Sequence, residues 1–213
     1  GLLRIPNAYG IAYIIDGQHR VYGYSNSIHK DTHTIPVVAF QNMLSEEQLK
    51  IFMEINENQK AVSKNLRLDL ELDLFWTSPR LDSRMKALRS SIIKALSGES
   101  GNILYNKISI GEDQSILSSV FFDKGLLHSG LIPKALQTKW SGNTESCLYD
   151  VTETNIDKAM IDSRKRISQY LNSCYEIADG HMQEDTKAVF LFSNRATYPF
   201  VTLMGLLHAH LFA

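Results

Sequence analysis

The chain has 213 residues, of which 44% are hydrophobic and 21% charged, and its formal net charge is −1. This composition is typical of a globular protein with a sizeable core, and the near-neutral charge argues against a strongly basic nucleic-acid-binding domain. Cys147 and Cys174 lack metal-ligand spacing, which favours buried free thiols in a reducing, cytoplasmic compartment. The longest apolar run, residues 200–213, is too short to span a bilayer, so we expect no membrane contact.

Both ends of the sequence are apolar. Residues 1–5 (Gly-Leu-Leu-Arg-Ile) contain no methionine, and residues 206–213 stop within a hydrophobic pattern. Chain ends are normally polar and exposed. We therefore expect the sequence to be a piece of a longer protein.

The first elements follow a strand, helix, loop, strand order. Residues 11–15 form an apolar run that predicts a buried strand, and the pattern becomes helical from residue 17 to about 27. A polar loop follows, and residues 35–40 (Ile-Pro-Val-Val-Ala-Phe) predict a second buried strand. This order is typical of an α/β or α+β fold.

The rest of the chain is predicted to be mostly helical. Ser45 and Gln48 have the spacing of a capping box that opens a helix. Residues 66–74 alternate strictly with leucine, which indicates a strand by period, but their companions are poor strand formers, so we prefer a helix. Further helices are expected at residues 81–98, at 154–180 after a second capping box, and from about residue 197 to the end. The period of the 154–180 helix places Ile177 on its core side, and residues 103–110 could form a short strand.

The turn between the first predicted strand and helix has the chemistry of an anion site. The first N–H groups of a helix have no intrahelical partner and lie at the positive end of its dipole. Gly17 would let a phosphate approach, the main-chain N–H groups of Gln18 and His19 would surround it, and Arg20 would bind an oxygen bidentately. Asp16 could position Mg²⁺ or a water, although capping the helix is the better-supported role. The alternative is an ordinary turn with a core histidine and a surface arginine.

Other chemistries find less support. The chain has no P-loop motif and no nucleophile elbow. The pairs His29 with His33 and His208 with His210 lack the spacing of a metal site, so no metal ligands are predicted. The basic tracts at residues 80–94 and 164–166 are the DNA-contact candidates, but such tracts are more often solvated helix faces.

The motif Asp16-Gly-Gln-His-Arg20, followed by residues 52–56 (Phe-Met-Glu-Ile-Asn) and Gln59, resembles the DGQHR-domain family. That family includes DndB-type proteins of DNA phosphorothioation systems and is similar to the ParB/sulfiredoxin superfamily, whose members bind a nucleotide phosphate at this turn. The resemblance covers roughly residues 9–75. It implies a small mixed ParB/sulfiredoxin-like sheet in residues 1–75, lacking its usual N-terminal part, and a helical region packed on it in residues 76–213.

By this resemblance the ligand is ATP or another nucleoside triphosphate with Mg²⁺, in a prokaryotic DNA-modification or defence protein. Asp16 and His19 are then the catalytic candidates, while hydrolysis itself is left open. Asn56 and Gln59 would form a second wall, and Asn194 and Arg195 would approach from the far end of the sequence.

Gln18 stands where sulfiredoxins carry their cysteine, so cysteine-based sulfinate repair is not expected. The alternative function is a non-enzymatic DNA-binding regulator of the transcription of a DNA-modification locus. The oligomeric state is not predicted.

Overall fold

The computed structural model describes residues 8, 12–57, 68, 70, 72, 74–111 and 115–212, with only the backbone of residues 45, 46, 56 and 57. Contacts divide the chain into two units, residues 1–61 and 62–213. The sequence had placed the boundary after residue 75. Each unit is described by itself.

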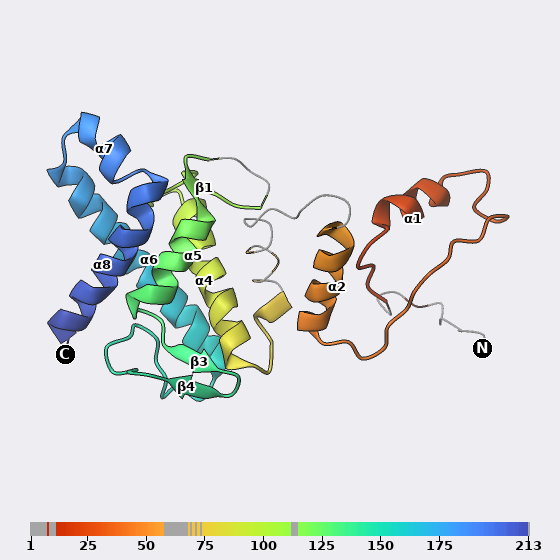
Figure 1. Cartoon of the computed structure of the whole chain (residues 1–213), viewed down its shortest axis with the longest axis horizontal. Coiled ribbons are helices and arrows are strands. Elements are labelled where there is room, and N and C mark those ends of the chain that lie inside the picture. The colour runs from red at the N-terminus through yellow and green to blue at the C-terminus, as the bar shows by residue number, and fades with distance from the viewer. Residues whose placement is uncertain are drawn as a thin grey trace. The chain divides into compact units, whose positions relative to one another are not determined.

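The first unit contains helix α1 (Gln18–Ser25) and helix α2 (Ser45–Glu57), both of which the sequence predicted (Figure 1). Residues 12–15 and 35–40, by contrast, have no strand conformation, so the two strands expected there are wrong for these described residues. An apolar run becomes a strand only when a neighbouring strand pairs with its backbone. The ParB-like sheet accordingly stays a prediction.

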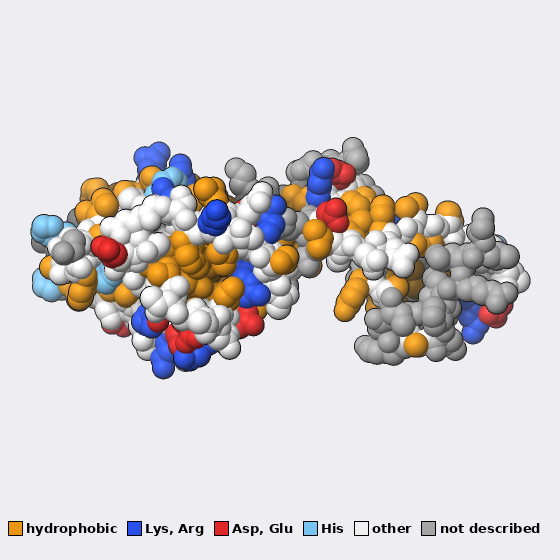
Figure 2. Space-filling view, turned by 90° about the horizontal axis from the view of Figure 1, so that it is seen from below, with side chains coloured by type: hydrophobic (Ala, Val, Ile, Leu, Met, Phe, Trp, Pro, Cys, Tyr) orange, Lys and Arg blue, Asp and Glu red, His pale blue; other side chains and the backbone are white. Residues whose placement is uncertain are grey.

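Hydrophobic side chains lie at the surface of the first unit (Figure 2). Tyr13, Ile28, Val37 and Val38 are each more than 70% exposed, at 87%, 90%, 74% and 80%. Among the described residues of this unit, Leu49 is the one buried hydrophobic residue. The described part of the first unit thus has very little core of its own.

At both helices that were predicted to open with a capping box, the structure shows one capping hydrogen bond, one residue away from the expected position. At α2 the Glu47 carboxylate accepts from the Leu44 N–H at 2.9 Å, and the Gln48 side chain donates to the Met43 carbonyl at 3.0 Å, whereas the Ser45 side chain lies outside the described part of the chain. At α6 (Ile156–His181) the cap is Asn155, whose side chain accepts from the Lys158 N–H at 3.0 Å. Thr154 had been expected in that role. Asn is a stronger N-cap than Thr, which accounts for the shift.

The second unit is a helix-dominated α+β assembly with two small sheets. Besides α6 it contains α4 (Leu81–Gly98), α5 (Ser119–Ser129), α7 (Glu184–Phe190) and α8 (Asn194–Phe212). Its sheets pair β1 (Ile108–Ser109) in parallel with β2 (Leu117–Ser118), and β3 (Lys134–Leu136) antiparallel with β4 (Lys139–Ser141).

Three observations on the second unit bear on the sequence predictions: the first confirms a prediction and the other two contradict one. The described leucines between residues 66 and 74, at positions 68, 70, 72 and 74, are helical, as preferred over a strand. Helix α8 begins at Asn194 rather than near Thr197, so Pro199 lies inside the helix. Ile177, predicted to face the core from α6, is 64% exposed.

The core of the second unit forms where α4, α5, α6 and α8 pack together (Figure 1). Leu88, Ile92 and Leu96 of α4 are fully buried, as the helical period predicted. Tyr175 of α6 is also fully buried, with its ring centroid 4.4 Å from that of Phe200 of α8. Burial raises the pKa of Tyr175, so its hydroxyl stays protonated at the centre of the core.

The basic residues of α4 are not a uniformly solvated face. The Arg89 side chain is 10% exposed, and its Nε lies 2.6 Å from Asp123 Oδ1 of α5. Arg84 reaches from α4 to Asp157 of α6 at 2.7 Å. The expectation of a solvated face is therefore wrong for these two residues, which tie α4 to its neighbours.

Helices α5 and α8 approach closely at two glycines. A Cβ on Gly125 would lie 2.8 Å from Val201 Cβ, and a Cβ on Gly205 would collide with the Ser129 carbonyl oxygen. Only a residue without a Cβ therefore lets the two backbones meet at Gly205. Among the described residues, no helix is long and apolar enough to cross a membrane.

We expect Gly205→Ala to lower the free energy of unfolding by about 1–3 kcal/mol, because the methyl group overfills the contact with α5. The matched control is Gly180→Ala in α6, where a Cβ would meet nothing within 4 Å. This control should be neutral or stabilising by up to about 1 kcal/mol, since alanine is the better helix former. Urea unfolding of both variants measures the difference, and equal effects would contradict the close approach.

Stability should also fall as the pH drops below about 6.5, because burial lowers the pKa of His208. The side chain is 7% exposed, and its Nδ1 has no hydrogen-bond partner within the described part of the chain. The unfolded state therefore takes up the proton more readily than the folded state, and protonation favours unfolding. In His208→Leu, the decrease in the free energy of unfolding between pH 7 and 5.5 that comes from His208 should disappear. A variant with the same pH profile of stability as the native chain would contradict this prediction.

Candidate functional site

The candidate site is the turn that starts α1. Gly17 is the N-cap residue of α1 and has a left-handed backbone with φ 92°. Residues with a Cβ rarely adopt this conformation, so the turn requires glycine. Among the described residues no side chain caps the helix, and the Val21 N–H donates to the Gly17 carbonyl at 3.0 Å. Within that part of the chain, the first-turn N–H groups of α1 are thus left without a side-chain acceptor.

Arg20 folds back over the turn. Its Nη2 would lie 3.4 Å from a Cβ on Gly17, so the guanidinium rests against the glycine. The same Nη2 donates to Asp16 Oδ2 at 3.0 Å, in a pair whose arginine side chain is 68% exposed. The turn therefore brings together a left-handed glycine, uncapped N–H groups and a guanidinium.

Asp16 does not cap the helix as expected, because its carboxylate pairs with Arg20 instead. The spacing of four residues was the signal for this pair, since residues i and i+4 are neighbours when the chain turns into a helix. Gln18 and His19 are both exposed on the first turn of α1. The alternative of a core histidine is therefore wrong for His19.

Asn56 and Gln59, the second group of residues predicted to line the site, lie mostly outside the described part of the chain. Asn56 belongs to the last turn of α2, where the structure describes its backbone and not its side chain. Gln59 lies outside the described residues. The roles predicted for both therefore stay predictions.

Asn194 and Arg195 belong to the second unit, at the start of α8. Asn194 Oδ1 accepts from the Ser118 N–H at 2.7 Å, and its Nδ2 donates to the Ile116 carbonyl at 3.5 Å. Both ends of the amide are used to hold β2 against α8, which is a structural role that the sequence did not predict. Arg195 is exposed on the first turn of α8.

The other candidate groups show no metal-site arrangement. The rings of His29 and His33 stack at a centroid distance of 4.3 Å. Among the described residues, no group of three His, Cys, Asp or Glu side chains could hold a metal ion. Cys147 and Cys174 are free and half-buried, and desolvation raises the pKa of both thiols.

Comparison of the chain with protein-family models, with curated proteins and with solved structures finds no match. The resemblance to the DGQHR-domain family therefore depends on the motif residues themselves.

We expect Asn194→Ala to lower the free energy of unfolding by about 1–2 kcal/mol, because the Ser118 N–H loses its acceptor. Arg195→Ala, one residue further on, should change it by less than about 0.5 kcal/mol, since its side chain is exposed. Thermal unfolding of the two variants measures these effects. A loss of nucleotide binding in Asn194→Ala without a loss of stability would instead restore Asn194 to the ligand site.

Proposed function

We propose that the turn from Asp16 to Arg20 binds a phosphate group of a nucleotide, with ATP as the favoured ligand. One observation carries the proposal: the Arg20 guanidinium lies against a left-handed Gly17 at an uncapped helix start. Main-chain N–H groups and an arginine are the donors that phosphate sites use. The family resemblance of the same five residues supports the same ligand.

The energetics of ligand exchange favour this function. The exposed pair of Arg20 with Asp16 contributes only about 0–1 kcal/mol, so a ligand can displace the carboxylate at little cost. A phosphate carries more negative charge than a carboxylate, and its oxygens can accept two parallel hydrogen bonds from the Arg20 guanidinium. A phosphate at this turn would also gain the N–H groups of Gln18 and His19, which the Asp16 carboxylate does not cap.

The proposal extends to Mg²⁺ and to a biological setting. A single carboxylate beside nucleotide phosphates suits Mg²⁺, which keeps several waters and takes few protein ligands. Asp16 is that carboxylate once Arg20 turns to the phosphate, and Mg²⁺ would neutralise phosphate charge when bound. Hydrolysis, with Asp16 and His19 as the acting residues, and a cytoplasmic role in DNA modification follow from the resemblance.

Calorimetry with ATP, CTP and GTP in the presence of Mg²⁺ tests the site. Arg20→Ala removes the guanidinium that is proposed to bind the phosphate, so we expect binding to weaken about tenfold or more. A tenfold change in affinity corresponds to about 1.4 kcal/mol. Lys30→Ala is the matched control, since Lys30 is an exposed cation of the same unit outside the turn. Its affinity should stay within about twofold of the native value.

Two results would contradict the proposal. No binding of any nucleotide to the native chain at millimolar concentration removes the function, and equal binding by Arg20→Ala moves the site elsewhere. Salt dependence separates the DNA-binding alternative. Affinity for DNA should fall steeply between about 50 and 200 mM salt, whereas a nucleotide held largely by main-chain N–H groups should show a shallow dependence.

A further inference from the structure

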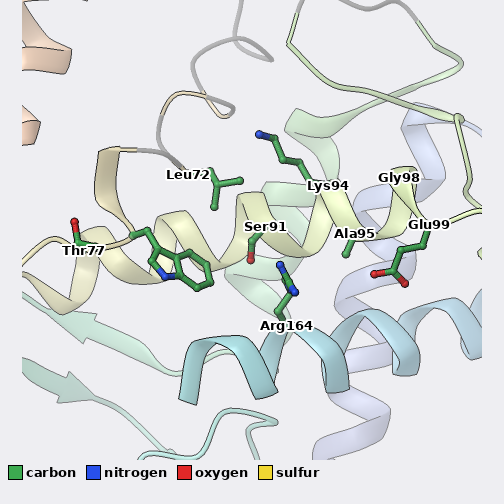
Figure 3. Close-up of a pocket in the computed structure, with 9 residues that line it drawn as sticks. Leu72, Thr77, Ser91, Lys94, Ala95, Gly98, Glu99 and Arg164 are labelled. Carbon is green, nitrogen blue, oxygen red and sulfur yellow. The ribbon is translucent and has the colours of Figure 1, made fainter. Parts of the chain in front are cut away.

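A pocket of about 650 Å³ lies in the second unit, and none of the residues proposed to bind the nucleotide phosphate lines it. It forms where α4, α6 and the segment around residues 72–77 meet. Figure 3 shows Arg164 rising from α6 toward Ser91 on α4. The described residues that line the pocket are Leu72, Trp76, Thr77, Ser91, Lys94, Ala95, Gly98, Glu99 and Arg164.

Arg164 differs from the neighbouring arginines. Arg84, Arg89 and Arg166 are all held, by Asp157, by Asp123 and by the Leu148 carbonyl oxygen respectively. Arg164, in contrast, is exposed, lines the pocket, and makes no hydrogen bond or ion pair with the described residues. A guanidinium with five donors and no acceptor beside a cavity is suited to an anion.

The other charges of the pocket limit the charge of the ligand. Lys94 takes part in another interaction within the chain, so Arg164 is the cation on which the inference rests. Glu99 also lines the pocket and opposes a highly charged anion. The balance of these side chains suits a ligand with one anionic group better than a polyphosphate.

The remaining wall is apolar and partly flat. Trp76 is half-buried, and Leu72 and Ala95 line the same space. An indole offers a large planar surface on which an aromatic ring can stack, at about 0.5–1.5 kcal/mol beyond the area that is buried. Small-molecule sites commonly combine such an apolar lining with a few placed polar groups, and volumes of about 300–1,000 Å³ are usual for them.

We propose that this pocket binds a small planar organic anion, with the ring on Trp76 and a carboxylate or phosphate monoester on Arg164. The lining residues all belong to residues 62–213, whereas the proposed nucleotide turn belongs to residues 1–61. The inference therefore stands independently of the proposed function.

Fluorescence of the full chain tests the pocket. The chain has two tryptophans, so Trp140→Phe leaves Trp76 as the only one. In this background, benzoate and phenyl phosphate should each be titrated as probes for the two anion types. Saturable quenching by one of them is the expected result and tells which anion is preferred; no saturable change with either at millimolar concentration overturns the proposal.

Three variants locate the anion. Arg164→Gln should weaken binding at least tenfold, whereas Lys165→Gln, the next exposed cation of α6, should change it by less than about twofold. Glu99→Gln should tighten binding severalfold, because an acidic neighbour is removed, and this gain cannot arise from misfolding. Equal binding by Arg164→Gln and the native chain overturns the proposal.

Two control ligands and one control variant complete the test. Benzyl alcohol keeps the ring without the charge and inorganic phosphate keeps the charge without the ring, so each should bind at least tenfold more weakly than the preferred probe. Equal binding of benzyl alcohol overturns the role of Arg164. Arg20→Ala should leave the titration unchanged, which separates a failure here from a failure at the nucleotide turn.

Discussion

The Arg89 guanidinium inside the helical core constrains the rest of the second unit. A buried charge without a partner is strongly unfavourable, so α5 has to present Asp123 to α4 at this level. Gly125 follows two residues later on α5, turned by about 200° around the helix axis. The ion pair toward α4 and the glycine contact with Val201 of α8 therefore lie on opposite sides of α5. Both contacts form at the same rotation of α5 about its axis, so each one stabilises the orientation that the other requires.

Helices α1, α2, α4, α6 and α8 were predictable from local sequence, whereas α7 and the pairing of the strands were not. The period of Met85, Leu88, Ile92 and Leu96 predicted α4, because each buried side chain recurs on one face, and Gly98 predicted where the helix ends. Residues 35–40 have an equally apolar pattern but no strand conformation. Pairing with another strand decides strand formation, and a single sequence does not contain that information. Strand β1 lies within residues 103–110, where a short strand was expected, but its pairing with β2 escaped prediction for the same reason.

The turn at Gly17 was predictable because its signals are local. A glycine before a helix start and an arginine within the first turn can be recognised from neighbouring residues, and the structure brings them together. The role of Asn194 was not predictable, because its partners on β2 are more than 70 residues away in the sequence. Arg89 was mistaken for a surface residue for a similar reason, since its partner Asp123 lies on another helix.

The contacts of α8 also determine how the second unit can move. Its first residue, Asn194, holds the backbone of β2, the Met204 carbonyl accepts from the Tyr170 hydroxyl at 2.7 Å, and Gly205 meets Ser129. Moving a helix along its axis by one residue displaces every contact by about 1.5 Å, which is enough to break a hydrogen bond. Shear of α8 against α5 and α6 would thus break these hydrogen bonds and disturb the contact at Gly205 at the same time, which disfavours such a motion.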